Sequence, residues 1–319
     1  MISEQLAGQQ LAYTLGGVNA PNLGQKIEGK VRDCFVVGDK RVLVASDRLS
    51  AFDRVLTTIP FKGQMLTQLA HFWFEKTSHI VKNHIINYPH PNVLVAHEIE
   101  MLPVEVVIRG YLTGSAWRDY TAGKDISGIV LPKGMKRSQR FDAPLITPST
   151  KGERGVHDEP IPSEQIVDSG LVEKGLWQEV CRIAQELFAF GTIHAQKQGL
   201  ILVDTKYEFG FLTDASGKKE IILADEIHTQ DSSRYWMSDS YNESFETGQD
   251  PDMLDKEFVR RWLIEQGYMG DGKPPVFTDE FRVATAIKYA EAYEKITGTE
   301  FSAKVGSLKE EIEAVLCSL

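Results

Sequence analysis

The sequence is poor in cysteine and has no long apolar run. Its three cysteines, Cys34, Cys181 and Cys317, are too few and too scattered for a disulfide framework or a clustered zinc site. We interpret them as ordinary buried thiols in a reducing compartment. No segment approaches the roughly 18 apolar residues of a membrane span, and the polar start MISEQLAGQQ lacks the apolar core of a signal peptide. We therefore expect a cytoplasmic protein that does not bind a membrane.

Positive charge is also in short supply. The 319 residues include 35 Lys and Arg against 45 Asp and Glu, which gives a net charge of −10. Non-specific nucleic-acid binding depends on neutralising phosphates, so we expect no nucleic-acid partner. Only a local basic site could attract an anionic ligand. The composition, 42% hydrophobic and 25% charged, suits a globular protein with a sizeable core in two lobes.

The composition and the hydrophobic pattern of the sequence change along the chain. Short β-like runs, with one helical insertion around 66–82, fill residues 25–110 and predict a small, mainly antiparallel sheet. Residues 111–160 are rich in Gly, Pro, Lys and Thr and predict a disordered segment or a functional loop system. A long amphipathic helix is expected at 172–198 and a β-hairpin formed by LILVDTKYEFGFL and KEIILADEI. Further helices are expected at about 255–267, at about 279–297 and from 308.

Charged residues fall on the predicted hairpin where packing residues are usual. Because strand side chains alternate, Asp204, Lys206 and Glu208 share one face. A solvated outer face would tolerate these charges. The partner strand, however, brings Asp225 and Glu226 near its end, and carboxylates that converge repel unless a cation lies between them. Two carboxylates with phosphate oxygens and waters are the usual ligands of Mg²⁺ beside a nucleotide, so the hairpin favours a Mg-nucleotide site.

Two polar clusters in the first half of the chain add to this interpretation. The run EGKVRD has a glycine that permits close approach to phosphate, with Lys30 and Arg32 on one side of the strand. It matches neither the Walker A nor the GxGxxG pattern, and a surface turn is the alternative. The run ASDRLSAFD, at 45–53, follows an apolar strand and suits a ligand-binding loop. The alternative is a helix start capped by Ser46 or Asp47.

A third cluster ends an apolar strand. In VVIRGYLTGSAW, residues 106–117, Arg109 is preceded by strand residues with no acid beside it except Glu105. A guanidinium fixed in this way favours a carboxylate or phosphate partner.

Six motifs occur in order along the chain: GKVRD, SDRLSAFD, PVEVVIRGYLTGSAW, TPSTKGERGVHDEPI, LVDTKYEFG and LADEIHTQDSSRYW. In this set the chain resembles the SAICAR synthetases, the phosphoribosylaminoimidazole-succinocarboxamide synthases of purine biosynthesis, from about residue 14 to the C-terminal helices. The resemblance implies an α+β fold of two lobes with ATP in the cleft between them. An antiparallel-sheet nucleotide lobe, similar to the small lobe of protein kinases, would take residues 1–105, and a larger α+β lobe would take 106–319.

The resemblance also implies a reaction. ATP, the nucleotide 5-amino-1-(5-phosphoribosyl)imidazole-4-carboxylate and L-aspartate would give SAICAR, ADP and phosphate through an acyl phosphate. Because a carboxylate is a poor acyl donor, ATP must activate it first, and catalysis is mainly positioning and charge neutralisation. The expected cofactors are ATP and Mg²⁺, and the expected partners are small-molecule substrates.

The family's functional residues match positions in each motif. Lys206 and Arg109 would be catalytic, and Glu208 and Asp225 would hold Mg²⁺. The remaining roles implied by the resemblance are ATP binding by Lys30, Arg32, Glu98, Met101, Leu102, Lys206, Glu208 and Asp225, and substrate binding by Ser50, Asp53, Arg109, Ser115, Lys151, His157, Asp231 and Arg234. Gln230 stands where the family favours proline, which puts the turn before Asp231 in question.

Two other classes of function stay open on the residues alone. A small-molecule kinase would use the same Mg-ATP site but would release ADP without aspartate. A non-catalytic nucleotide-binding regulator would bind without turnover and would not need both Glu208 and Asp225. The motifs settle neither the oligomeric state nor the residues that recognise L-aspartate.

Overall fold

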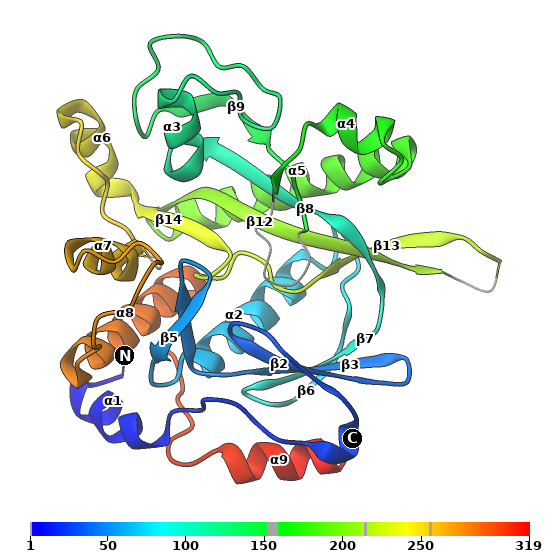
Figure 1. Cartoon of the computed structure of the whole chain (residues 1–319), viewed down its shortest axis with the longest axis vertical. Coiled ribbons are helices and arrows are strands. Elements are labelled where there is room, and N and C mark those ends of the chain that lie inside the picture. The colour runs from blue at the N-terminus through cyan, green and yellow to red at the C-terminus, as the bar shows by residue number, and fades with distance from the viewer. Residues whose placement is uncertain (1, 152–158, 214–215, 255–256) are drawn as a thin grey trace. The chain divides into compact units, whose positions relative to one another are not determined.

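The computed structural model describes residues 2–151, 159–213, 216–254 and 257–319, and it consists of two compact units (Figure 1). The first unit contains residues 1–72, 84–98 and 254–319, and the second contains 73–83 and 99–253. These units differ from the expected domains 1–105 and 106–319, because residues 254–319 group with the N-terminal part of the chain. In the described ranges no helix is long and apolar enough to cross a membrane.

The first unit is built on a five-stranded sheet in which every neighbouring pair is antiparallel. The strand order is β1 (Lys26–Glu28), β2 (Arg32–Val37), β3 (Lys40–Ala45), β7 (Val93–His97) and β6 (Ile85–His90). A separate hairpin, β4 (Arg48–Ala51) and β5 (Arg54–Thr58), precedes helix α2 (Lys62–Thr77), which continues into the second unit. The expected small antiparallel sheet with a helical insertion is therefore confirmed.

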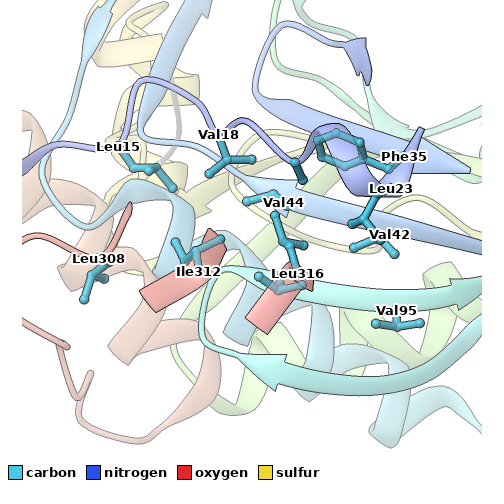
Figure 2. Close-up of a cluster of buried hydrophobic side chains, with 12 residues drawn as sticks. Leu15, Val18, Leu23, Phe35, Val42, Val44, Val95, Leu308, Ile312 and Leu316 are labelled. Carbon is cyan, nitrogen blue, oxygen red and sulfur yellow. The ribbon is translucent and has the colours of Figure 1, made fainter. Parts of the chain in front are cut away.

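The C-terminal helix completes the core of this unit. Helices α1 (Glu4–Gln10), α7 (Glu257–Glu265), α8 (Asp279–Thr297) and α9 (Lys309–Cys317) belong to it. Leu308, Ile312 and Leu316 follow a four-residue spacing that places them on one side of α9. Figure 2 shows these side chains directed at residues of the sheet and the N-terminal segment, such as Val44 and Leu15. The helices expected at about 255–267, 279–297 and from 308 are confirmed as α7, α8 and α9.

The second unit contains a seven-stranded sheet. Its main path is β11 (Glu159–Pro160), β10 (Ser149–Thr150), β8 (Glu100–Tyr111), β12 (Leu200–Thr213) and β13 (Lys219–Ala224). Strand β9 (Arg140–Ile146) pairs with β8, and β14 (Ser233–Met237) pairs with β12. The hairpin expected from the sequence is confirmed as β12 and β13.

Helix α5 (Lys174–Lys197) covers one face of this sheet (Figure 1). Its apolar residues recur at helical spacing, and eight of them are buried, among them Ile183, Leu187 and Phe188. The side chain of Glu173 caps its first turn by accepting hydrogen bonds from the backbone N–H groups of Gly175 and Leu176. Two glycines, Gly175 and Gly191, lie inside the helix, and Gly191 has a packing role described below.

Residues 111–160 contain more regular structure than we expected. The described part forms α3 (Gly114–Thr121), β9, β10 and β11, and a small core of Leu112, Ala116, Ile126 and Phe141 packs α3 against β9. These apolar residues are separated by turns, so no period of 2 or 3.6 is visible in the sequence. Helices α4 (Ser163–Asp168) and α6 (Ser238–Thr247) were not expected either.

Candidate functional site

One face of the sheet in the second unit carries a row of charged side chains from three strands. Strand pairing sets Asp204 opposite Arg109 of β8 and Arg234 of β14, and it sets Glu208 opposite Glu105. Directly opposed residues project to the same side of a sheet, so these charges share a face with Lys206. Helix α5 packs on the other face, where Phe188 lies against Gly110. The expected alternation of β12 is therefore confirmed, with its charged side away from α5.

Lys206 is the centre of the first charged cluster. Its Nζ donates hydrogen bonds to Glu105 Oε1 at 2.8 Å and to Glu208 Oε1 at 2.5 Å. Lys151 Nζ donates to the other oxygen of Glu208. Burial opposes the charge of Lys206, but Glu208, Asp225 and Glu105 outweigh burial and raise the pKa of its ammonium group. Lys206 is thus a permanent cation and cannot act as a general base near neutral pH.

Asp225 reaches this cluster through an unusual backbone. Continuing the pairing of Glu208 with Ala224 by one residue would set Asp225 opposite Tyr207, on the buried face. Strand β13 instead ends at Ala224, and Asp225 adopts a left-handed conformation with φ of 60°. Asp225 acts electrostatically on Lys206. The other expected carboxylate, Glu226, is buried and accepts a hydrogen bond from the Thr229 hydroxyl at 2.6 Å.

The carboxylates of this cluster suit a hard cation. Glu208 accepts hydrogen bonds from two ammonium groups, those of Lys206 and Lys151, so positive charge is favourable beside both of its oxygens. Asp225 adds a second acidic group. In the part of the chain that the structure describes, no group of three or more His, Cys, Asp or Glu side chains could hold a metal ion. Glu208 and Asp225 supply two carboxylates, and Mg²⁺ commonly takes one or two carboxylates and completes its shell with phosphate oxygens and waters.

Arg109 and Arg234 form the second cluster around Asp204. Arg109 donates to Asp204 Oδ2 at 3.3 Å, to Thr147 Oγ1 at 2.9 Å and to Ser115 Oγ at 3.2 Å. Arg234 Nη1 lies 3.5 Å from the same Asp204 oxygen. Burial, together with Arg234, lowers the pKa of Arg109, while Asp204 opposes this effect. Two guanidinium groups share the Asp204 carboxylate, and guanidinium groups are well suited to bind carboxylate and phosphate anions.

Gly114 allows this arrangement at the first residue of α3. A Cβ atom at this position would lie 2.3 Å from Arg234 Nη1, and the φ of 60° is unfavourable for other residues. The guanidinium group therefore occupies the space that any larger residue would need. The predicted residues Arg109, Ser115 and Arg234 are brought together near the start of α3.

Five of the predicted residues lie in the first unit. Lys30 lies in the turn before β2, not on the strand as we expected, and its ammonium group forms an ion pair with the exposed carboxylate of Asp53. Arg32 begins β2, and Ser50 is buried in β4. Glu98 accepts two hydrogen bonds from Arg41, at 2.6 and 2.7 Å.

Other polar residues of ASDRLSAFD have structural roles. Buried Arg48 donates to the backbone oxygens of Gly16, Gly29 and Lys30 and forms an ion pair with Asp33. Asp47 accepts from the backbone N–H groups of Leu15 and Gly63. The hydrogen bonds that Arg48 donates to Gly29 and Lys30 fix the turn that carries Lys30. The alternative of a capped helix start is wrong, because β4 follows this loop.

The remaining predicted residues lie on β8 and in the loop before β14. Met101 and buried Leu102 belong to β8, and Asp231 is half-buried. The turn before Asp231 forms without proline, because Ser233 N donates to Thr229 O at 2.9 Å and Thr229 N donates to Ser232 Oγ at 3.2 Å. His157 lies outside the described residues.

The sequence analysis gave no role to three contact residues of the two clusters. Glu105 and Asp204 neutralise Lys206 and the arginines, and Thr147 orients Arg109. Glu105 could have been predicted from its position opposite Glu208 in the sheet. That position can be predicted only when the register between two strands far apart in sequence is known.

Comparison with known proteins gives a consistent result. A model of the family described as SAICAR synthetase matches residues 25–275. The phosphoribosylaminoimidazole-succinocarboxamide synthase of Cytophaga hutchinsonii is 47% identical over 288 residues, which cover 89% of this chain and 91% of that protein. The SAICAR synthase of Saccharomyces cerevisiae, solved in complex with SAICAR, is 34% identical with a TM-score of 0.79, over 91% of this chain and all of that one. A SAICAR synthetase solved with ADP is 25% identical with a TM-score of 0.66, over 88% and 100% of the two chains.

Proposed function

This chain belongs to the SAICAR synthetase family, and we propose that the two charged clusters on one sheet face of its second unit carry out the family's reaction. It is an ATP-dependent ligase of purine biosynthesis that joins L-aspartate to 5-amino-1-(5-phosphoribosyl)imidazole-4-carboxylate and gives SAICAR, ADP and phosphate. The observation that carries the assignment of residues is the shared face: the Lys206 cluster suits a metal-bound nucleotide, and the Arg109 cluster suits an anionic substrate.

The chemistry takes two steps. An oxygen of the imidazole carboxylate attacks the terminal phosphorus of ATP, the bond to ADP breaks, and an acyl phosphate forms. The amine of L-aspartate then attacks the acyl carbon, phosphate leaves, and the amine loses a proton as the amide bond forms. Both steps join or separate anions, so cations must be placed where the negative charge develops.

Lys206 supplies such a cation in this proposal. Its ammonium group is held by Glu105 and Glu208 and stays protonated, so it would lie against the transferred phosphate. Glu208 and Asp225 would hold Mg²⁺. When bound, this ion neutralises phosphate oxygens during transfer.

The other assignments follow the two groups of residues. Arg109 and Ser115 would bind the imidazole carboxylate, because the guanidinium group is already oriented by Thr147 and Ser115. The further proposed contacts are Lys30 and Arg32 with the ATP phosphates, Glu98, Met101 and Leu102 with the adenine, Asp231 and Arg234 with the ribose phosphate, and Ser50, Asp53, Lys151 and His157 with the substrate.

The proposal is tested by ADP release from ATP and Mg²⁺ in the presence of the imidazole carboxylate nucleotide, with and without L-aspartate. Release that needs both co-substrates, with SAICAR formed in equal amount, is the expected result. Release that is indifferent to L-aspartate would instead favour a kinase, and binding without turnover would favour a regulator.

A further inference from the structure

A buried contact joins the two segments that carry the Lys206 cluster. Tyr207 lies on β12 between Lys206 and Glu208, with its side chain on the opposite, fully buried face. Its hydroxyl is 2.5 Å from Nε2 of His228, which is also fully buried. His228 lies three residues after Asp225 and three before Asp231. One hydrogen bond therefore ties the strand of Lys206 and Glu208 to the loop of both aspartates.

His228 makes three further contacts that restrict its position. Its ring lies against Gly191 of α5, where a Cβ atom would be 2.3 Å from Cε1 and 2.7 Å from Nδ1. The ring of Trp73 meets it edge-on, with centroids 4.6 Å apart. Its backbone oxygen accepts a hydrogen bond from the Tyr235 hydroxyl at 2.9 Å. Such a tightly surrounded ring has one position, and it fixes the loop around it.

The loop needs this restraint because its backbone is strained. Asp225 has a φ of 60° and His228 a φ of 51°, and each conformation costs free energy in a residue other than glycine. Without an anchor, the segment could relax toward a regular strand end, and Asp225 would turn away from Lys206. The contacts of His228 lie on the α5 side of the sheet, away from Lys206, so the ring would act on the site through the backbone.

We propose that His228 and Tyr207 are a positioning pair that sets Asp225 against Lys206 and Glu208 for binding of the metal-nucleotide complex. This inference rests on the proposed function for the identity of the ligand. It goes beyond that function because neither residue touches the charged face. The hydroxyl group of Tyr207 on the strand contacts His228, and His228 in turn holds the loop in its conformation.

The first test compares two single-hydroxyl deletions. Tyr207→Phe keeps the ring but removes the contact with His228. Tyr241→Phe is the matched control, since its hydroxyl donates to the Ser138 oxygen at 2.9 Å in the same unit and touches no residue of 225–231. The readouts are kcat, the Mg²⁺ concentration that gives half-maximal turnover, and the rise in Tm that ADP with Mg²⁺ produces.

Tyr207→Phe should lower kcat on the order of 10- to 100-fold, because displacements of about 1 Å in an active site have effects of that size. It should also raise the Mg²⁺ requirement and reduce the Tm rise, whereas KM for L-aspartate should stay within about twofold of the Tyr241→Phe value. Equal Tm rises and equal Mg²⁺ requirements in the two variants would overturn the proposal, even if Tyr207→Phe were less stable.

The second test asks whether the two residues act through one contact. His228→Gln keeps a polar atom within reach of the Tyr207 hydroxyl, and His228→Leu has similar bulk without one. His228→Gln should retain more of the ADP-induced Tm rise than His228→Leu. The double variant Tyr207→Phe with His228→Leu should be no worse than His228→Leu alone, since effects through a shared contact are not additive. Full additivity of the two losses would contradict the pair.

Measurements on the wild-type protein distinguish a failure of this inference from a failure of the proposed function. If the wild type fails to release ADP in the presence of both co-substrates, the proposed reaction is wrong. The Tm rise with ADP and Mg²⁺ still measures the positioning of Asp225 in that case. If the wild type turns over and Tyr207→Phe matches Tyr241→Phe in every readout, only the positioning pair is wrong.

Discussion

Lys206 shows how surrounding acids decide what a half-buried amine can do. Three carboxylates keep its ammonium group charged, although burial alone would favour the neutral form. An amine of lowered pKa would be available as a base or nucleophile, whereas Lys206 can only donate hydrogen bonds and positive charge. At the scale of single residues, this fixed charge fits the electrostatic stabilisation that the proposed acyl phosphate mechanism requires.

Replacing Lys206 with alanine should lower kcat by about 10²–10³-fold, the usual effect of removing one donor that stabilises developing charge. The matched control is Lys219→Ala on the neighbouring strand β13, because Lys219 is exposed and stacks on Phe211. The control should keep wild-type kcat in the ADP-release assay. Near-normal turnover in Lys206→Ala would remove the phosphate contact from this residue, provided that both variants give the wild-type circular dichroism spectrum.

Asp47 should make the stability of the protein pH-dependent. Burial raises its pKa to about 6, although two backbone N–H groups and Lys62 oppose the shift. The folded state then keeps a proton that the unfolded state releases above about pH 4. The stabilising contribution is complete below that pH and is lost as the pH rises through 6, by about 3 kcal/mol in total.

The measurement for Asp47 is the free energy of urea unfolding of wild type and Asp47→Asn between pH 4 and pH 7. The asparagine variant cannot titrate, so the wild type should lose stability relative to it across this range. A stability difference between the two proteins that does not change with pH would reflect only the one hydrogen bond that asparagine cannot accept. A difference that grows in favour of the wild type with rising pH would show that the carboxylate is preferentially ionised in the fold.

At the scale of elements, the regular hydrophobic pattern within one helix or strand could be predicted from the sequence. Local departures from regular backbone conformation could not. The alternation along β12 gave the charged face, and the helical period gave α5, α8 and α9, because both patterns are properties of one segment. The position of Asp225 depends on a left-handed residue at the end of β13, and strict alternation would have placed it on the buried face. The α3 region was missed since its small core is assembled from residues between turns.

A substitution at Gly114 tests how the start of α3 positions the guanidinium group of Arg234. Gly114→Ala puts a Cβ atom into the guanidinium group of Arg234, and the matched variant Gly123→Ala lies just after the same helix with a φ of 73° and no atom within 4 Å. Both should lose about 1 kcal/mol of stability from the left-handed conformation. Only Gly114→Ala should raise KM for the imidazole nucleotide, by about tenfold or more for one weakened charged hydrogen bond. Equal KM values would separate Arg234 from substrate binding.

At the scale of the whole molecule, the first unit is closed by pairs of residues 296 and 240 positions apart in sequence. Gln10 and Gly306 exchange two hydrogen bonds, at 2.8 and 3.0 Å, and Gln64 does the same with Lys304, at 2.8 Å in both directions. The side chains of α9 complete the core beside β2 and β3 (Figure 2). The sequence predicted α9 as an amphipathic helix, but its partner could not be identified, since an apolar stripe specifies burial and not the surface that covers it.

The contribution of this closure can be measured at Ile312, which is fully buried on α9. Ile312→Ala should reduce the free energy of urea unfolding by about 2–5 kcal/mol, because the loss of methyl groups leaves a cavity between the helix and the sheet. Ile264→Ala on α7 is the matched control in the same unit. That side chain is 51% exposed, so its removal should change stability by no more than about 0.5 kcal/mol. Equal effects would mean that α9 is only loosely attached to the sheet, and the N-terminal unit would then have to be stable without its C-terminal helix.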